Sequence, residues 1–129
     1  MVFVPGYLYK RHRMTGADLA APRAALKRIG LTHHFVETVE DGAIEVNAEI
    51  VAAAIQQQAR AGRRLILASV SKSGAEVALA LSRLGPTETD HVVAWVNIAG
   101  TLQGSPLADE GLLQFEELIG GSISLASKA

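Results

Sequence analysis

Three serines, Ser69, Ser71 and Ser73, stand at alternate positions where an apolar stretch gives way to a helical pattern. A central serine with a small residue two positions to either side is the spacing of a nucleophile elbow, a sharp strand-to-helix turn that strains its central residue. Such a turn exposes the Ser71 hydroxyl for attack on a carbonyl carbon. The backbone N–H of Lys72, at the start of the helix, can then face the developing oxyanion. The structural alternative is that small residues let the strand and helix pack closely, with Ser73 capping the helix.

The elements that must position these serines follow from apolar periodicity and from glycine and proline stops. Strands are predicted at 2–4, 32–39, 63–70 and 91–99, and helices within 16–29, 47–61, 72–84 and 109–119. Continuous apolar strands that alternate with helices are typical of a parallel sheet covered on both faces. We therefore expect one α/β domain over residues 1–129, with three α/β/α layers around a mostly parallel four-stranded sheet.

Composition excludes several classes of function. The chain has 129 residues, 49% of them hydrophobic, no cysteine and a net charge of −1. Disulfides and thiolate catalysis are therefore excluded, and nothing favours nucleic acid or an anionic membrane as a partner. No apolar run reaches the ~18 residues of a membrane span, and the first residues lack the features of a signal peptide, so we expect a cytoplasmic chain.

Metal and nucleotide sites are not expected either. His33 and His34 are neighbours on a predicted strand and face opposite sides, so they cannot easily chelate one metal. The glycine-rich phosphate-loop signatures are absent. We expect no metal and no cofactor.

Ligands of open parallel sheets bind beyond the carboxyl ends of the strands. At that edge Tyr7, Leu8, Tyr9 and Leu102 could line an apolar cleft for an acyl group. The basic run "KRHR" (10–13) could bind a carboxylate, a phosphate or a lipid headgroup, or it could be a solvated loop.

Several segments resemble the α/β-hydrolase superfamily, in particular its lipases and esterases. "LILASVSKSGAEVALAL" (65–81) is similar to the strand, elbow and helix of that family, with Ser69 and Ser73 in place of the usual glycines. "VFVPGYLYK" (2–10) resembles the strand and oxyanion loop, with Pro5 where a histidine is common and Gly6 retained. "VVAWVNIAGTLQGSPLAD" (92–109) is similar to the strand after the elbow helix and its loop.

The resemblance implies a spatial strand order of 2-1-3-4 and a serine hydrolase that acts on carboxylic or lipid esters. It makes Ser71 the nucleophile. The oxyanion donors would be the backbone N–H groups of Lys72 and of Tyr7 or Leu8, and Gly6, Leu8 and Leu102 would contact the substrate.

The catalytic base is the open question. In the family the acid and the histidine follow the serine. His91 is the sole downstream histidine, and it is expected at the opposite edge of the sheet. Three explanations remain: a piece of a larger hydrolase, a rearranged triad, and a non-catalytic binding module with a hydrolase-like or flavodoxin-like fold. A rearranged triad would use His12 as base and Asp109 as acid, with Glu37 or Glu40 as other candidates for orienting the base.

A sheet cut short also leaves an exposed edge strand, at 91–98 or 32–39. We therefore expect a homo-oligomer or a complementing chain.

Overall fold

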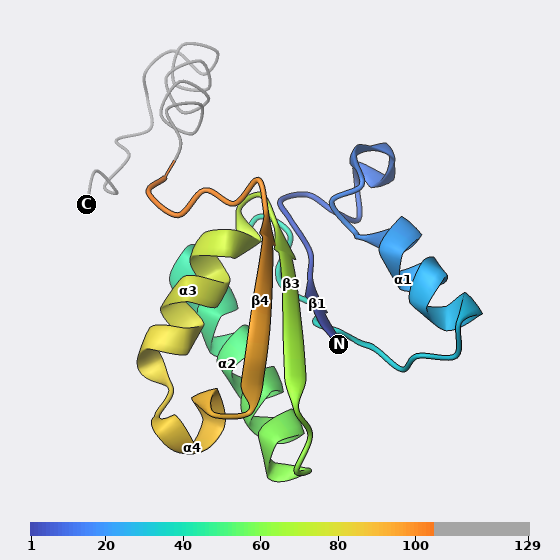
Figure 1. Cartoon of the computed structure of the whole chain (residues 1–129). Helices are drawn as coiled ribbons and strands as arrows, with labels where there is room; N and C mark the ends of the chain where they lie inside the picture. Colours follow the sequence, from blue (N-terminus) through green and yellow to red (C-terminus); the bar gives the residue numbers. More distant parts are fainter. Residues whose placement is uncertain (105–129) are drawn as a thin grey trace, which may run out of the picture.

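Four parallel strands form one sheet in the order β2-β1-β3-β4 (Figure 1). The structure is a computed structural model that describes residues 1–104. The strands are β1 (Val2–Val4), β2 (His34–Phe35), β3 (Leu65–Val70) and β4 (Val92–Ile98). The helices are α1 (Ala20–Arg28), α2 (Ile44–Arg60), α3 (Ser73–Arg83) and α4 (Pro86–Thr89), with a 3-10 turn, η1, at Arg13–Thr15. This arrangement confirms the predicted small α/β fold and the order 2-1-3-4.

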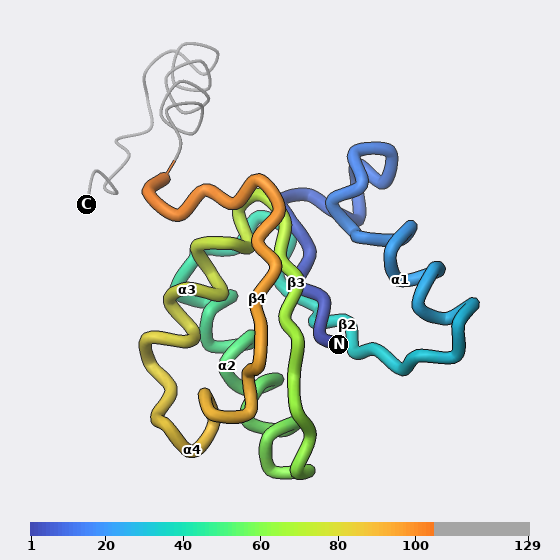
Figure 2. The backbone as a smooth tube through the Cα atoms, viewed as in Figure 1, coloured from blue at the N-terminus to red at the C-terminus, as the bar shows by residue number. Residues whose placement is uncertain are grey.

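Helices cover the sheet unequally on its two faces. The tube view shows α2 and α3 beside β3 and β4, and α1 beyond β1 and β2 (Figure 2). Alternate side chains of a strand face opposite sides. Val4 and Leu67 therefore join the core beneath α2 and α3, whereas Phe3 and Ala68 join a smaller cluster that includes Leu26 of α1.

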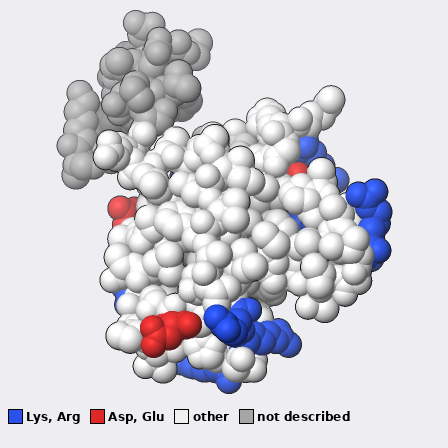
Figure 3. Space-filling view, in the orientation of Figure 1, with Lys and Arg blue, Asp and Glu red and all other residues white. Residues whose placement is uncertain are grey.

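Among residues 1–104, no helix covers the half of the sheet formed by β3 and β4 on the α1 side. Ile66, Val96 and Ile98 are 39%, 47% and 45% exposed. The register pairs Ala68 with Val96 and Val70 with Ile98, so these side chains share one face. Uncharged atoms cover the surface over β3 and β4 in the space-filling view (Figure 3). Both strands predicted to be edges, β2 and β4, are edges.

Two predicted boundaries are wrong. The second strand is limited to His34–Phe35 rather than 32–39 because it pairs only with β1, which is itself only three residues long. Helix α2 begins at Ile44, not at an Asn47 cap, because the Asn47 side chain is occupied with the backbone of Val39. The helix expected at 109–119 lies outside the described residues. Within residues 1–104, no helix is both long enough and apolar enough to span a bilayer.

Candidate active site

The turn between β3 and α3 has the backbone geometry of an elbow. Only Ser71 and Lys72 separate the two elements, and Ser71 has a φ of 55°, in the left-handed region. For a residue with a Cβ this conformation costs about 1–2 kcal/mol. The Ser71 N–H donates to the Ile98 carbonyl (3.0 Å), and its own carbonyl accepts from Gly74 (3.0 Å) and Thr101 (3.3 Å). The backbone of the turn is thus fixed from both sides.

The Ser71 hydroxyl, by contrast, has no hydrogen-bond partner among residues 1–104, and the residue is partly exposed. Both flanking serines are fully buried. Ser69 Oγ accepts from Trp95 Nε1 (2.8 Å) and donates to Asn97 Oδ1 (3.1 Å), so it ties β3 to β4. The middle hydroxyl is therefore the one left available for chemistry.

Ser73 serves the same purpose toward β1. Its Oγ accepts from the Val70 N–H (2.9 Å) and lies 2.9 Å from each of two carbonyl oxygens, those of Val4 and Val70, to which its proton can be donated. The helix-cap role considered for Ser73 does not occur, because the N-cap position of α3 is Lys72 and carries no side-chain cap bond. Ser73 instead joins the carboxyl ends of β1 and β3.

Two of the three expected oxyanion donors keep unpaired N–H groups. No partner for the N–H of Tyr7 or of Lys72 occurs within residues 1–104, whereas the Leu8 N–H donates to the Glu40 carbonyl (3.2 Å). Gly6 brings this loop against the elbow, since a Cβ on it would lie 3.0 Å from the Val70 carbonyl oxygen. The sequence left Tyr7 and Leu8 as alternatives, and the hydrogen bonding favours Tyr7.

A buried polar cluster lies behind the elbow, and sequence reasoning missed it. Glu76 is 2% exposed. Its Oε1 accepts from Lys72 Nζ (2.5 Å) and from Asn47 Nδ2 (2.9 Å), and Lys72 also donates to the Gly42 carbonyl (2.5 Å). This carboxylate therefore holds the Lys72 ammonium behind the elbow. The i, i+4 spacing of Lys72 and Glu76 was the signal available in the sequence.

The expected base makes no hydrogen bond to the nucleophile within residues 1–104. His12 is exposed in the loop before η1, and its recorded hydrogen bonds involve its backbone, which donates to the Leu8 carbonyl (2.9 Å) and accepts from Thr15. His91 lies at the amino end of its strand, as predicted, and His33 and His34 lie at the amino end of theirs. Asp109, the expected acid, lies outside the described residues.

The other acids expected near the base differ in position. Glu37 is exposed. Glu40 accepts the backbone N–H groups of Lys10 (2.6 Å) and Arg11 (2.8 Å), and its second oxygen is 3.7 Å from Arg11 Nε. Glu40 therefore anchors the basic loop that carries His12.

The predicted substrate contacts flank the elbow unevenly. Tyr7 and Leu102 are 51% and 53% exposed, and Leu102 follows Thr101, whose N–H binds Ser71. Tyr9, by contrast, is buried in the core. Its hydroxyl donates to the Thr38 carbonyl (3.0 Å), and burial raises its pKa above 10.0.

A cavity of about 450 Å³ lies at the opposite edge of the sheet, away from Ser71.

In the part of the chain that the structure describes, no three acidic or histidine side chains lie close enough together to hold a metal ion.

Comparison with known proteins identifies no relative of this chain. No family model matches the sequence, and no curated protein or solved structure matches it.

Proposed function

We propose that this chain carries the nucleophile of a serine hydrolase that acts on carboxylic or lipid esters. The observation that carries the proposal is the left-handed φ of Ser71, held between two fully buried serines at a strand-to-helix turn. A strained residue that the surrounding structure over-determines is a feature of functional sites. The N–H groups of Tyr7 and Lys72, which have no partner among residues 1–104, add a second element of the same chemistry.

The proposed reaction proceeds by acyl transfer. The Ser71 oxygen attacks the ester carbonyl carbon while its proton passes to a base, and the oxyanion faces the N–H groups of Tyr7 and Lys72. Collapse breaks the ester bond and releases the alcohol, which takes the proton, and water then cleaves the acyl-enzyme. The exposed side chains of Tyr7 and Leu102 are the candidate contacts for the acyl group.

The base has two possible sources. His12 is the one histidine at the carboxyl edge of the sheet, and movement of its loop would be required to bring it to Ser71. The other source is a histidine of a complementing chain or of a further part of the protein. The two sources make different predictions for the His12→Ala variant.

Covalent labelling tests the nucleophile. A fluorophosphonate probe is expected to label the wild type and Ser82→Ala equally, and not to label Ser71→Ala. Ser82 is a matched control because it is an exposed serine of α3. Mapping of the adduct to a residue other than Ser71, or labelling that persists in Ser71→Ala, overturns the proposal.

Turnover of p-nitrophenyl esters tests the base. Loss of a general base costs about 10²–10⁴-fold in rate. If His12 is the base, His12→Ala loses that factor and Ser71→Ala loses the reaction. If the base comes from elsewhere, His12→Ala retains the wild-type rate.

A second candidate function is a non-catalytic binding module. The observation that favours it is that no histidine within residues 1–104 is hydrogen-bonded to Ser71. It predicts equal background rates for wild type, Ser71→Ala and His12→Ala, and no fluorophosphonate adduct on any of them.

A further inference from the structure

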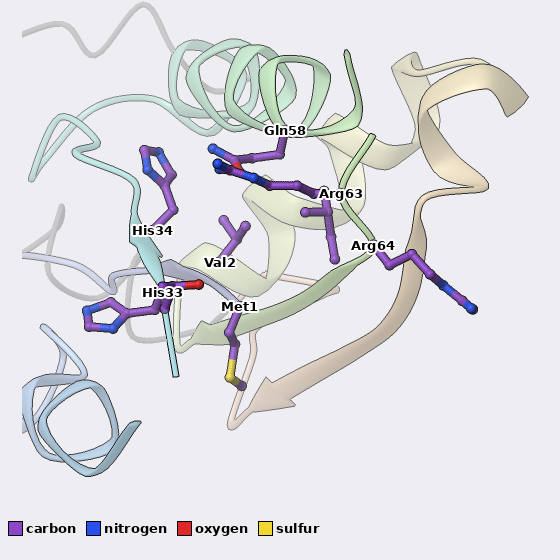
Figure 4. Close-up of a pocket in the computed structure, with 9 residues that line it drawn as sticks. Met1, Val2, His33, His34, Gln58, Arg63 and Arg64 are labelled. Atoms are coloured by element: carbon purple, nitrogen blue, oxygen red, sulfur yellow. The ribbon is translucent and has the colours of Figure 1, made fainter. Parts of the chain in front are cut away.

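The cavity at the amino-terminal edge of the sheet is independent of the elbow. It measures about 450 Å³, within the range of small-molecule sites. Its walls are the segment before β2 and the connection from α2 to β3, and Val2, which is 1% exposed, lies at its base. Figure 4 shows His34, Gln58 and Arg63 directed toward one another above Val2, with Arg64 extending away.

One hydrogen bond determines which donors of these polar groups remain free to bind a ligand. Arg63 Nη1 donates to Gln58 Oε1 (2.7 Å), and Gln58 is only 8% exposed. The bond occupies the acceptor of the amide and leaves its two N–H donors. It also leaves the other guanidinium N–H groups of Arg63 without a side-chain acceptor among residues 1–104.

The remaining lining adds donors and no negative charge. Thr32 contributes a hydroxyl and His34 an imidazole, and neither side chain has a hydrogen-bond partner within the described part of the chain. Among residues 1–104, no aspartate or glutamate lines the cavity, whereas Arg63 and Arg64 do, and of these two the Arg63 side chain is the one directed into it (Figure 4). A hollow with an excess of donors and of positive charge favours an oxyanion, which supplies several acceptors at once.

We propose that this cavity binds a small molecule through a phosphate or carboxylate group. Two oxygens of that group accept from the Arg63 guanidinium, and Gln58 Nε2 and the Thr32 hydroxyl donate to the same group. The internal bond from Arg63 to Gln58 holds the guanidinium in place before the ligand arrives, which lowers the side-chain ordering cost of binding.

The test is an NMR titration of the full chain at constant ionic strength. Inorganic phosphate and succinate are the two probes, with chloride exchanged for each of them. We expect saturable shifts with one midpoint at the amides of Val2, Thr32 and Arg63. The tighter of the two probes then assigns the ligand as a phosphate or a carboxylate, and either assignment upholds the site.

Two variants and one control separate the cavity from general attraction between charges. Arg63→Gln is expected to weaken binding roughly ten- to a hundredfold, and Gln58→Leu several-fold, because each removes donors to a charged group. Arg60→Gln is the control, since Arg60 is an exposed arginine at the end of α2 that does not line the cavity. It should bind as the wild type does.

Thermal unfolding gives a second readout, because a ligand that binds only the folded state raises the melting temperature. Phosphate or succinate should raise it for the wild type and Arg60→Gln, and not for Arg63→Gln. The proposal fails if no saturable shifts occur, if Arg60→Gln weakens binding as much as Arg63→Gln, or if the shifts map to residues 10–13. Ester turnover plays no part in these measurements, so the result is independent of the proposed hydrolase function.

Discussion

Replacement of Ser71 by glycine should make the protein more stable while it removes the proposed nucleophile. Ser71 has a φ of 55°, which glycine adopts without steric cost. The serine hydroxyl has no hydrogen-bond partner among residues 1–104, so its loss leaves no buried group unpaired. The substitution therefore acts mainly on backbone strain.

The expected magnitude is the difference of two terms. Relief of the left-handed conformation gains about 1–2 kcal/mol. The greater freedom of glycine in the unfolded chain offsets about 0.4–1 kcal/mol of that gain. The net expectation is a free energy of unfolding about 0.5–1 kcal/mol higher than that of the wild type. Ser71→Ala retains the Cβ and hence the strain, and should stay within about 0.5 kcal/mol of the wild type.

Urea denaturation followed by circular dichroism measures these differences. The corresponding rise in melting temperature for Ser71→Gly is about 2–5 °C. Ser82→Gly is the control because Ser82 lies within α3, where glycine is unfavourable, and it should lose about 0.5–1 kcal/mol. The strain argument is refuted if Ser71→Gly is no more stable than Ser71→Ala.

Three further predictions concern the surroundings of the elbow and the open sheet. Glu76→Ala should cost roughly 2–4 kcal/mol in urea denaturation, because it leaves the Lys72 ammonium, whose side chain is only 23% exposed, without its carboxylate partner. The free energy of unfolding of the wild type should fall as the pH rises above 10.0, because the unfolded chain loses the Tyr9 proton more readily than the folded chain does. An equal fall in the Tyr9→Phe variant would contradict this. We expect the chain to self-associate through the open face and edge of β4. Light scattering should show that Val96→Lys abolishes the association and that the control Val46→Lys does not. A monomeric wild type at high concentration counts against this prediction.

The elements were predictable because their signals are local. Apolar strands alternating with periodic helices specify a parallel sheet covered by helices, and the spacing of Ser69, Ser71 and Ser73 placed a turn between β3 and α3. The strand order came from the resemblance to hydrolases rather than from periodicity. Boundaries were less predictable, since β2 is shorter than its apolar pattern because a strand extends only as far as its partner pairs with it.

The sequence predicted which residues of the candidate site lie at the carboxyl edge of the sheet. It did not predict which side chains they contact. Sequence placed His12 and Lys72 at the carboxyl edge, but it could not show that His12 makes no hydrogen bond to Ser71 within residues 1–104 or that Lys72 turns back to a buried carboxylate. The bond between Asn47 and Glu76 joins residues 29 positions apart. Such contacts depend on how α2 and α3 pack together, and no local pattern records that packing.

The amino-acid sequence by itself determined the class of fold, the position of the turn and the small residues that let it form, because hydrophobic period and side-chain size act along the chain. Tertiary structure alone decided which groups remain unpaired. Ser69 and Ser73 are bonded to adjacent strands, whereas the Ser71 hydroxyl has no partner among residues 1–104. Arg63 and Gln58 leave donors in a cavity since their one mutual bond occupies the acceptor. Most buried polar groups find hydrogen-bond partners when the chain folds, and the groups left without partners are the ones available for chemistry. Which groups these are is therefore a property of the folded molecule.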